Sequence, residues 1–314
     1  MDDKIDMSLE AIRQGFAVST HNQAIAYSGG KDSLVVADLI YRFFPDKKPW
    51  IVFGDTGIEF PESLKFALES GKAFAGDRFV RARPDKLEKD GLKYEAQVET
   101  LKWLVKAGRV KEVLKDDGKL KSTDALERAA TAEMWADFYR RNLVWHKGTT
   151  KSYWWCCDQY GYPILGKSFS KLGARRINID CFLKFSETKS DKPELIDYYE
   201  LLRNVKVSQM CCKVLKKEPS EREQAAHDVD VIFKGLMAEE SHSRMINFST
   251  RGFLFKSSRP HLGDDPFYHC NPISHFTETD VWEYIRRYDI PYSPLYDMTW
   301  ADKNGNTHCI RRNG

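Results

Sequence analysis

A glycine turn between two apolar segments restricts the possible folds of this chain more than any other feature. Residues 24–27 are apolar and predict a strand, and residues 34–41 have the periodicity of an amphipathic helix. Six residues join them: Ser28, Gly29, Gly30, Lys31, Asp32 and Ser33. Glycines let the backbone approach a ligand closely, and the N–H groups of a first helical turn, the helix dipole and a lysine all favour an anion. We therefore predict a phosphate-binding loop.

An ordinary strand-to-helix turn with a solvated lysine is the alternative interpretation. Such a turn accounts for one glycine, but not for two adjacent glycines together with a basic residue and flanking hydroxyl groups. The loop also differs from the Walker A pattern, because its lysine directly follows the second of two adjacent glycines.

Apolar runs alternate with helical segments along much of the chain. Residues 49–53, 78–82 and 229–234 predict further strands, and residues 8–18 predict a short helix. This alternation is typical of an α/β fold with a doubly wound, mostly parallel sheet. In such folds, ligands bind at the carboxyl ends of the strands.

Composition excludes several classes of protein. The 314 residues include 49 basic and 46 acidic ones, and a net charge of +3 gives no global field for unspecific nucleic-acid binding, although a local basic patch remains open. No apolar stretch approaches the length of a membrane span, and the N-terminus lacks a signal-peptide pattern. We therefore expect a cytoplasmic protein without a membrane partner.

Three later motifs follow the loop along the chain. Residues 53–62 read FGDTGIEFPE, residues 235–244 read GLMAEESHSR, and residues 271–292 contain NPI, DVWEYI and IPY. The loop resembles the pyrophosphate-binding loop of the PP-loop superfamily, and the later motifs are similar to those of its phosphoadenosine phosphosulfate (PAPS) reductase family. Phe276 stands where that family usually has tryptophan. The resemblance spans residues 24–297 and implies an adenine nucleotide α-hydrolase-like fold.

We expect four segments along the chain. Residues 1–83 form the first part of the nucleotide-binding α/β core, and residues 84–150 form a helical insertion. Residues 151–270 form the remainder of the core, with a basic loop and a cysteine pair, and residues 271–314 form a C-terminal helical and tail region. The lysine and glutamate runs of the insertion predict solvated helix faces.

The resemblance implies a nucleotide site at the strand ends. The phosphates of PAPS, adenylylsulfate (APS) or ATP are expected on the loop, with Asp32 and Asp55 as candidates for Mg²⁺ or for the nucleotide's hydroxyl groups. Glu240 and Arg244 are expected to close over the phosphate or sulfate, Arg244 as a bidentate clamp. The expected binding residues beyond the loop are Asp55, Thr56, Gly57, Lys167, Glu240, Ser241 and Arg244. The expected catalytic residues are Lys31, Arg244 and Cys309.

A basic stretch follows the insertion. Residues 160–171 resemble a Y-G-x-P-x-x-x-K-x-x-S-K segment of bacterial and phage proteins that are broadly similar to PAPS reductases. Lys167, Lys171, Arg175 and Arg176 recur at helical spacing. They face either an anionic ligand or solvent, and both interpretations stay open.

Seven cysteines, four of them in two adjacent pairs, do not match a secreted disulfide framework. Cys211 and Cys212 resemble the pair that holds a [4Fe–4S] cluster in some family members, together with a later C-x-x-C. Cys309 would be a third ligand. Residues 312–314 resemble the segment before the missing C-x-x-C, so we expect the protein to continue past Gly314. Buried cysteines without metal are the alternative.

Cys309 has two further interpretations. It is a nucleophilic thiolate that Arg311 and Arg312 would activate, or it is a structural residue. The other adjacent pair, Cys156 and Cys157, follows two tryptophans and predicts a packed aromatic cluster.

Three functions follow from the resemblance. The first is reductive cleavage of PAPS or APS to sulfite and the nucleotide, with electrons from a thiol donor. The second is cleavage of ATP to AMP and pyrophosphate, with adenylation of an acceptor for sulfur transfer to a nucleic acid, as in tRNA thiolation or DNA phosphorothioation. The third is a non-catalytic nucleotide-sensing module. The motifs favour the first, and we expect a homo-oligomer or a complex.

Overall fold

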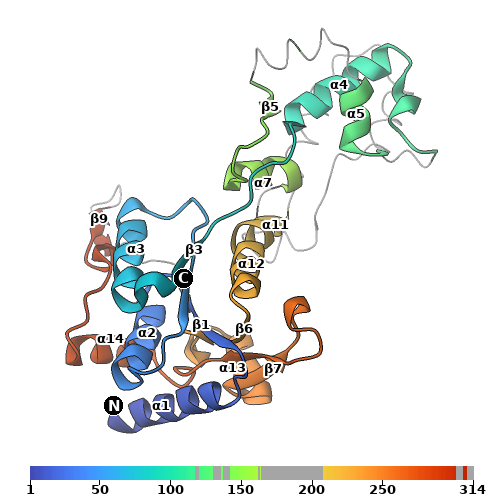
Figure 1. The fold of residues 1–314 in the computed structure, drawn as a ribbon. Coiled ribbons are helices and arrows are strands. Elements are labelled where there is room, and N and C mark those ends of the chain that lie inside the picture. The colour runs from blue at the N-terminus through green and yellow to red at the C-terminus, as the bar shows by residue number, and fades with distance from the viewer. Residues whose placement is uncertain are drawn as a thin grey trace. The chain divides into compact units, whose positions relative to one another are not determined.

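The computed structural model describes residues 1–116, 120–129, 136, 142–161, 163, 208–301 and 307–309, and every structural statement below concerns these residues. The chain folds into two compact units (Figure 1). The α/β unit consists of Met1–Arg83 and Glu218–Gly314, and the insertion unit consists of Pro84–Lys217. The described residues 151–161 and 208–217, which we expected in the α/β core, group with the insertion unit.

A six-stranded sheet forms the centre of the α/β unit. Its strands have the order β3-β2-β1-β6-β8-β7. Their bounds are β1 Asn22–Tyr27, β2 Trp50–Gly54, β3 Phe79–Ala82, β6 Val229–Lys234, β7 Leu254–Ser257 and β8 Phe267–Cys270. The edge strand β7 is antiparallel to β8, and the other neighbouring pairs are parallel. The predicted doubly wound, mostly parallel α/β fold is confirmed.

Helices cover both faces of this sheet (Figure 1). The first face carries α1 Asp2–Ala17, α2 Lys31–Phe43, α3 Pro61–Ala75 and α14 Glu278–Arg287. Ile25 and Phe233 point into this layer, whereas their neighbours Ala24 and Ile232 belong to the layer on the second face. On that second face, α12 (Glu218–Ala226) packs on β2, β3 and β6. Strand residues thus alternate between two buried layers, as a doubly wound sheet requires.

Shorter elements complete the α/β unit. Helix α13 spans His242–Arg251, and β9 (Thr299–Ala301) forms a hairpin with β10 (Thr307–Cys309). Single 3₁₀ turns occupy Gly76–Arg78, Ala238–Glu240, Pro260–Leu262 and Pro294–Tyr296. No helix in the described part of the chain combines the length and hydrophobicity that a membrane span requires.

The described part of the insertion unit contains three small cores, one of which is formed by Leu92, Ala96 and Val144. Its elements are β4 Gly91–Leu92, α4 Tyr94–Lys106, the 3₁₀ turn Val110–Glu112, α5 Thr123–Ala129, β5 Val144–Trp145, α7 Tyr153–Tyr160, α11 Met210–Cys212 and the π-helical segment Lys213–Lys217. Leu101, Leu104 and Leu126 are buried between α4 and α5. Cys156 and Cys211 are buried between α7 and α11.

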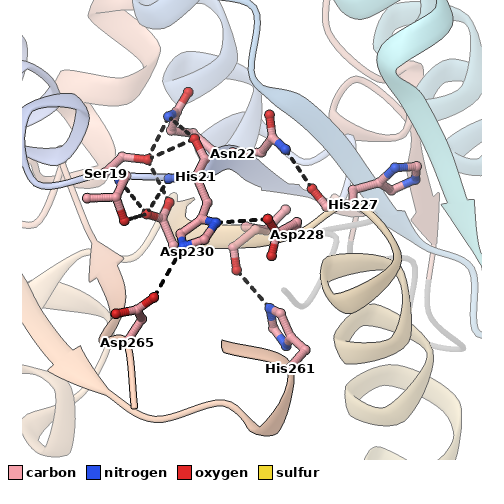
Figure 2. Close-up of polar contacts among 11 residues, drawn as sticks. Ser19, His21, Asn22, His227, Asp228, Asp230, His261 and Asp265 are labelled. Carbon is pink, nitrogen blue, oxygen red and sulfur yellow. Dashed lines mark hydrogen bonds and ion pairs between the residues drawn. The ribbon is translucent and has the colours of Figure 1, made fainter. Parts of the chain in front are cut away.

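A polar cluster joins the amino-terminal ends of β1 and β6 (Figure 2). The Asp230 carboxylate accepts hydrogen bonds from the backbone N–H groups of Thr20 (2.6 Å) and His21 (2.9 Å). The imidazole of His21 lies between two further carboxylates, with Nδ1 2.8 Å from Asp228 and Nε2 3.4 Å from Asp265. The cluster therefore ties the start of β1 to the turn before β6 and to the loop before β8.

We expect the stability of the α/β unit to depend on the protonation of His21. The hydrogen bond to Asp228, then that to Asp265 and the charge of Asp230, raise the pKa of His21 above its ordinary value. Because the folded state has the higher pKa, the contribution is fully present below about pH 6.5 and is lost as the pH rises through the folded pKa. The melting-temperature difference between wild type and His21→Asn should therefore shrink as the pH is raised from below about 6.5. A difference that stays constant as the pH rises would contradict the prediction.

Candidate nucleotide-binding site

The glycine loop after β1 has a backbone path that only glycine permits at one position. Gly29 has φ +68°, and a Cβ atom there would lie 2.6 Å from the Cβ of Ala67 in α3. Gly30 is the N-cap residue of α2, which begins at Lys31. The chain therefore turns tightly from the sheet into the helix, and the first-turn N–H groups of α2 lie at the carboxyl end of β1.

Hydroxyl groups hold the loop in this shape. The buried hydroxyl of Ser33 donates to the carbonyl of Gly30 (3.0 Å) and accepts from the N–H of Ser28 (3.2 Å). The Ser28 hydroxyl accepts in turn from the N–H of Gly30 (3.3 Å). These hydrogen bonds are internal to the loop, so they fix its backbone in the shape that a phosphate would contact.

Lys31 and Tyr296 meet at the start of α2. The Lys31 ammonium lies 2.8 Å from the Asp32 carboxylate, and the Lys31 side chain is 12% exposed. The backbone N–H of Lys31 donates to the Tyr296 hydroxyl (3.1 Å). This hydroxyl has its own hydrogen left to donate, and it lies beside the N–H groups that would bind an anion. The tyrosine is therefore a candidate phosphate contact that the sequence reasoning missed.

Asp55, just after β2, pairs with two arginines and is therefore not a free carboxylate. It is buried, and its Oδ2 lies 2.6 Å from the Arg81 guanidinium and 3.2 Å from that of Arg83. Its Oδ1 accepts from the N–H of Gly57 (3.0 Å), whereas Thr56 is bound by Glu59 (2.7 Å). With the Glu59 carboxylate on Thr56 and Gly57, this strand end carries two arginines and two carboxylates.

The end of β6 lies against the loop. A Cβ atom at Gly235 would be 2.6 Å from the backbone carbon and oxygen of Asp32, so these segments touch backbone to backbone. Farther along, Arg244 pairs with Glu240, and its N–H is capped by the Ser241 hydroxyl (3.3 Å). The Glu240–Arg244 pair thus lies at the same edge of the sheet as the loop. In these contacts, Arg244 binds residues of its own motif, residues 235–244.

The chain matches the model of the phosphoadenosine phosphosulfate reductase domain family over residues 22–131 and 169–311. It belongs to this family. The match includes the glycine loop, the Asp55 segment and the Glu240 motif, whose resemblance to PAPS reductases is thereby confirmed.

Individual relatives match a part of the chain. The adenosine 5'-phosphosulfate reductase of Lysinibacillus sphaericus is 31% identical over 32% of this chain and 38% of its own length. Sulfate adenylyltransferase subunit 2 of Maricaulis maris is 33% identical over 28% of this chain and 34% of its own. The chain therefore spans little more than a third of the length of these curated relatives. A crystal structure of the Candida auris PAPS reductase in complex with phosphate aligns with 92% of this chain and 83% of its own, at 14% identity and a TM-score of 0.42.

A buried hydrogen-bonded chain at the same end of the sheet was also missed. Lys234, the last residue of β6, has its ammonium 2.8 Å from Nδ1 of His269, whose Nε2 lies 2.9 Å from the Ser257 hydroxyl. Burial lowers the pKa of Lys234 to about 8 and that of His269 to about 3. The imidazole is therefore neutral, so it accepts from the lysine and donates to the serine. The sequence signal for this hydrogen-bonded chain was Lys234, a lysine at the end of a mostly apolar strand.

The described thiols do not complete a cluster site. Cys211 is buried beside Cys156, Val214 and Leu215, and burial raises its pKa, whereas Cys212 is exposed. A [4Fe–4S] cluster is bound through thiolates, four in the usual case. Within the described residues, no group of three or more histidine, cysteine, aspartate or glutamate side chains could hold a metal ion. The implied cluster at Cys211, Cys212 and Cys309 and the Mg²⁺ role of Asp32 and Asp55 stay predictions.

Some predicted residues lie outside the described part of the chain. Lys167 is one of them, and only the backbone of Cys309, in β10, is described. The predicted aromatic cluster at the first cysteine pair is partly confirmed, because Cys156 packs with Tyr153 and Trp155. Trp154, however, is 64% exposed and does not join it.

Proposed function

We propose that this protein binds PAPS or APS on the glycine loop and cleaves it reductively to sulfite and the nucleotide. The main support for this proposal is the hydrogen-bonded glycine loop with Lys31. The guanidinium groups of Arg81 and Arg83 lie at the same edge of the sheet. Membership of the PAPS reductase family supports a sulfonucleotide as the ligand. PAPS and APS carry phosphate and sulfate groups at separate positions, so several separate cations bind them better than one cation does.

The proposed reaction needs two thiols. A thiolate attacks the sulfonate sulfur, the sulfur–oxygen bond to the phosphate breaks, and AMP or its 3'-phosphate leaves with the electron pair. A second thiol then displaces sulfite and forms a disulfide, so the thiols lose the two electrons that sulfur gains. Cys309 or an external thiol donor supplies the first thiolate. Lys31 and Arg244 would stabilise the charge that develops on the departing phosphate. We place this chemistry in the cytoplasm, in a homo-oligomer or a complex with the donor.

ATP cleavage is the second candidate function. The relative named as a sulfate adenylyltransferase subunit favours it, because it shows that the matched region is not restricted to reductases. In this reaction the loop would hold the departing pyrophosphate while an acceptor, such as a nucleic acid, takes the adenylyl group. A nucleotide-sensing module would bind the same ligands without either reaction.

We expect sulfite to be released from APS or PAPS in the presence of a dithiol donor, and ATP to remain intact. The measurement is a parallel assay of sulfite and pyrophosphate with each nucleotide, with Mg²⁺ in all samples and Lys31→Ala as the control that removes loop-dependent turnover. Pyrophosphate without sulfite would overturn the reductase proposal in favour of adenylation. Tight nucleotide binding with neither product would favour the sensing module.

A further inference from the structure

The two units of the chain carry opposite charge. The insertion unit has 27 basic and 19 acidic residues, a formal net charge of +8. The α/β unit has 22 basic and 27 acidic residues, a formal net charge of −5. The value of +3 for the whole chain hides this division. A positively charged unit attracts polyanions. In our proposal the small nucleotide binds to the other unit, which is negatively charged.

A helix pair in the insertion unit carries exposed lysines on one helix and an exposed tryptophan on the other. Helix α7 packs on residues 210–217 through a small core that includes Cys156, Cys211, Val214 and Leu215. Three lysines of the second helix point to solvent: Lys213, Lys216 and Lys217. On α7, Trp154 is 64% exposed, and its ring is T-shaped to that of its neighbour Tyr153, with ring centroids 5.3 Å apart. An exposed indole stacks on a base, and cations on the same body hold the nucleic-acid backbone.

A two-stranded ribbon beside α7 repeats the pairing of lysine and tryptophan. Strands β4 and β5 pair antiparallel, and the pairing extends to Leu87, whose N–H donates to the carbonyl of Thr149 (2.8 Å). On this ribbon, the Lys93 ammonium lies 4.8 Å from the ring centre of Trp145. Trp145 in turn donates to Asp158 of α7 (2.9 Å), which fixes the ribbon against the helix. The ribbon and the helix pair therefore form one body.

A hollow between the ribbon and α7 combines an indole with charged side chains of both signs. Lys89, Lys151 and Trp155 line it together with the carboxylates of Glu88 and Asp90. The Lys151 ammonium lies 5.8 Å from the ring centre of Trp155. An indole stacks on the face of a base, which requires an unpaired base, whereas the amides of Gln97 and Gln159 already donate to the Leu92 carbonyl (3.1 and 3.2 Å).

We propose that the insertion unit binds single-stranded nucleic acid through this surface, with the phosphates on the lysines and the bases on the tryptophans. Duplex DNA fits less well, because its bases are already stacked and paired. The proposal does not depend on which reaction the glycine loop performs. It does agree with the large acceptor of the second candidate function, whereas a reductase would use the surface for a separate purpose.

The test is fluorescence anisotropy with labelled 20-nucleotide oligo(U), oligo(dT) and a matched duplex. The wild type should bind both single strands more tightly than the duplex, with an affinity that falls steeply as salt rises. The triple variant Lys213→Ala, Lys216→Ala and Lys217→Ala should reduce the slope of log affinity against log salt by about 2. Trp154→Ala should lower the affinity about 5- to 100-fold at an unchanged slope. The preferred strand distinguishes RNA from DNA as the ligand.

The control variant removes three exposed lysines from the α/β unit: Lys48→Ala, Lys65→Ala and Lys72→Ala. It should bind the oligonucleotides as the wild type does, and so should Lys31→Ala, which separates this proposal from the nucleotide site. Absence of single-strand binding by the wild type at low salt, or an equal loss in the control variant, would overturn the proposal. Tighter binding of the duplex would also overturn it.

Discussion

Replacing Lys31 with alanine should lower the affinity for nucleotide about 10- to 100-fold while the fold remains intact. A hydrogen bond to a charged group contributes about 1.5–3 kcal/mol, and Lys31 provides the ammonium at the start of α2 where the phosphates are expected. Its ion pair with Asp32 is local, and the side chain takes no part in the described cores. Because the side chain is 12% exposed and its removal leaves Asp32 without its partner, we expect a destabilisation of about 0.5–3 kcal/mol, which a folded domain tolerates.

Isothermal titration calorimetry with ATP, APS and PAPS measures this loss. The matched control is Lys48→Ala, which removes an exposed lysine from the same unit away from the loop. Thermal unfolding of both variants shows whether any loss of binding comes from unfolding. Unchanged affinity of Lys31→Ala for all three nucleotides would remove the phosphate role of the loop.

The glycine loop could be read from the sequence because its signal is local. The two glycines, the lysine and the serines are adjacent in the chain, and their hydrogen bonds connect residues at most five positions apart. The neighbouring strands were predicted for the same reason, since four of the six residues of β6 are apolar and adjacent or alternate in the sequence. Strands β7 and β8 were not predicted, because Lys256, Ser257 and His269 interrupt their short apolar runs.

The rest of the site depends on contacts between distant residues. The bond from Lys31 to Tyr296 joins residues 265 positions apart, and the one from Arg81 to Asp55 joins residues 26 apart. No local pattern encodes either of them. The sequence therefore indicated Asp55 as a candidate ion ligand, whereas its buried position between two arginines makes it a partner of cations.

Gly235→Ala should damage both stability and nucleotide binding, although the change adds only one methyl group. The new Cβ would lie 2.6 Å from the backbone carbon and oxygen of Asp32 and 2.8 Å from the nitrogen of Ser33. These are backbone atoms in the first turn of α2, so no side-chain rotation relieves the contact. Overpacking of this kind costs about 1–3 kcal/mol, more than the 0.4–1 kcal/mol that a Gly→Ala change gains through the unfolded chain.

The strand end and the loop must therefore separate in this variant, which shifts the N–H groups that would bind phosphate. We expect a loss of nucleotide affinity of at least about tenfold, since misplacement of a preorganised site by a fraction of an ångström is costly. The control is Gly91→Ala in β4 of the insertion unit, where an added Cβ meets nothing within 4 Å. Calorimetric titration and thermal unfolding of both variants provide the comparison. If Gly235→Ala binds nucleotide and unfolds like the wild type, the close approach of β6 to the loop does not shape the site.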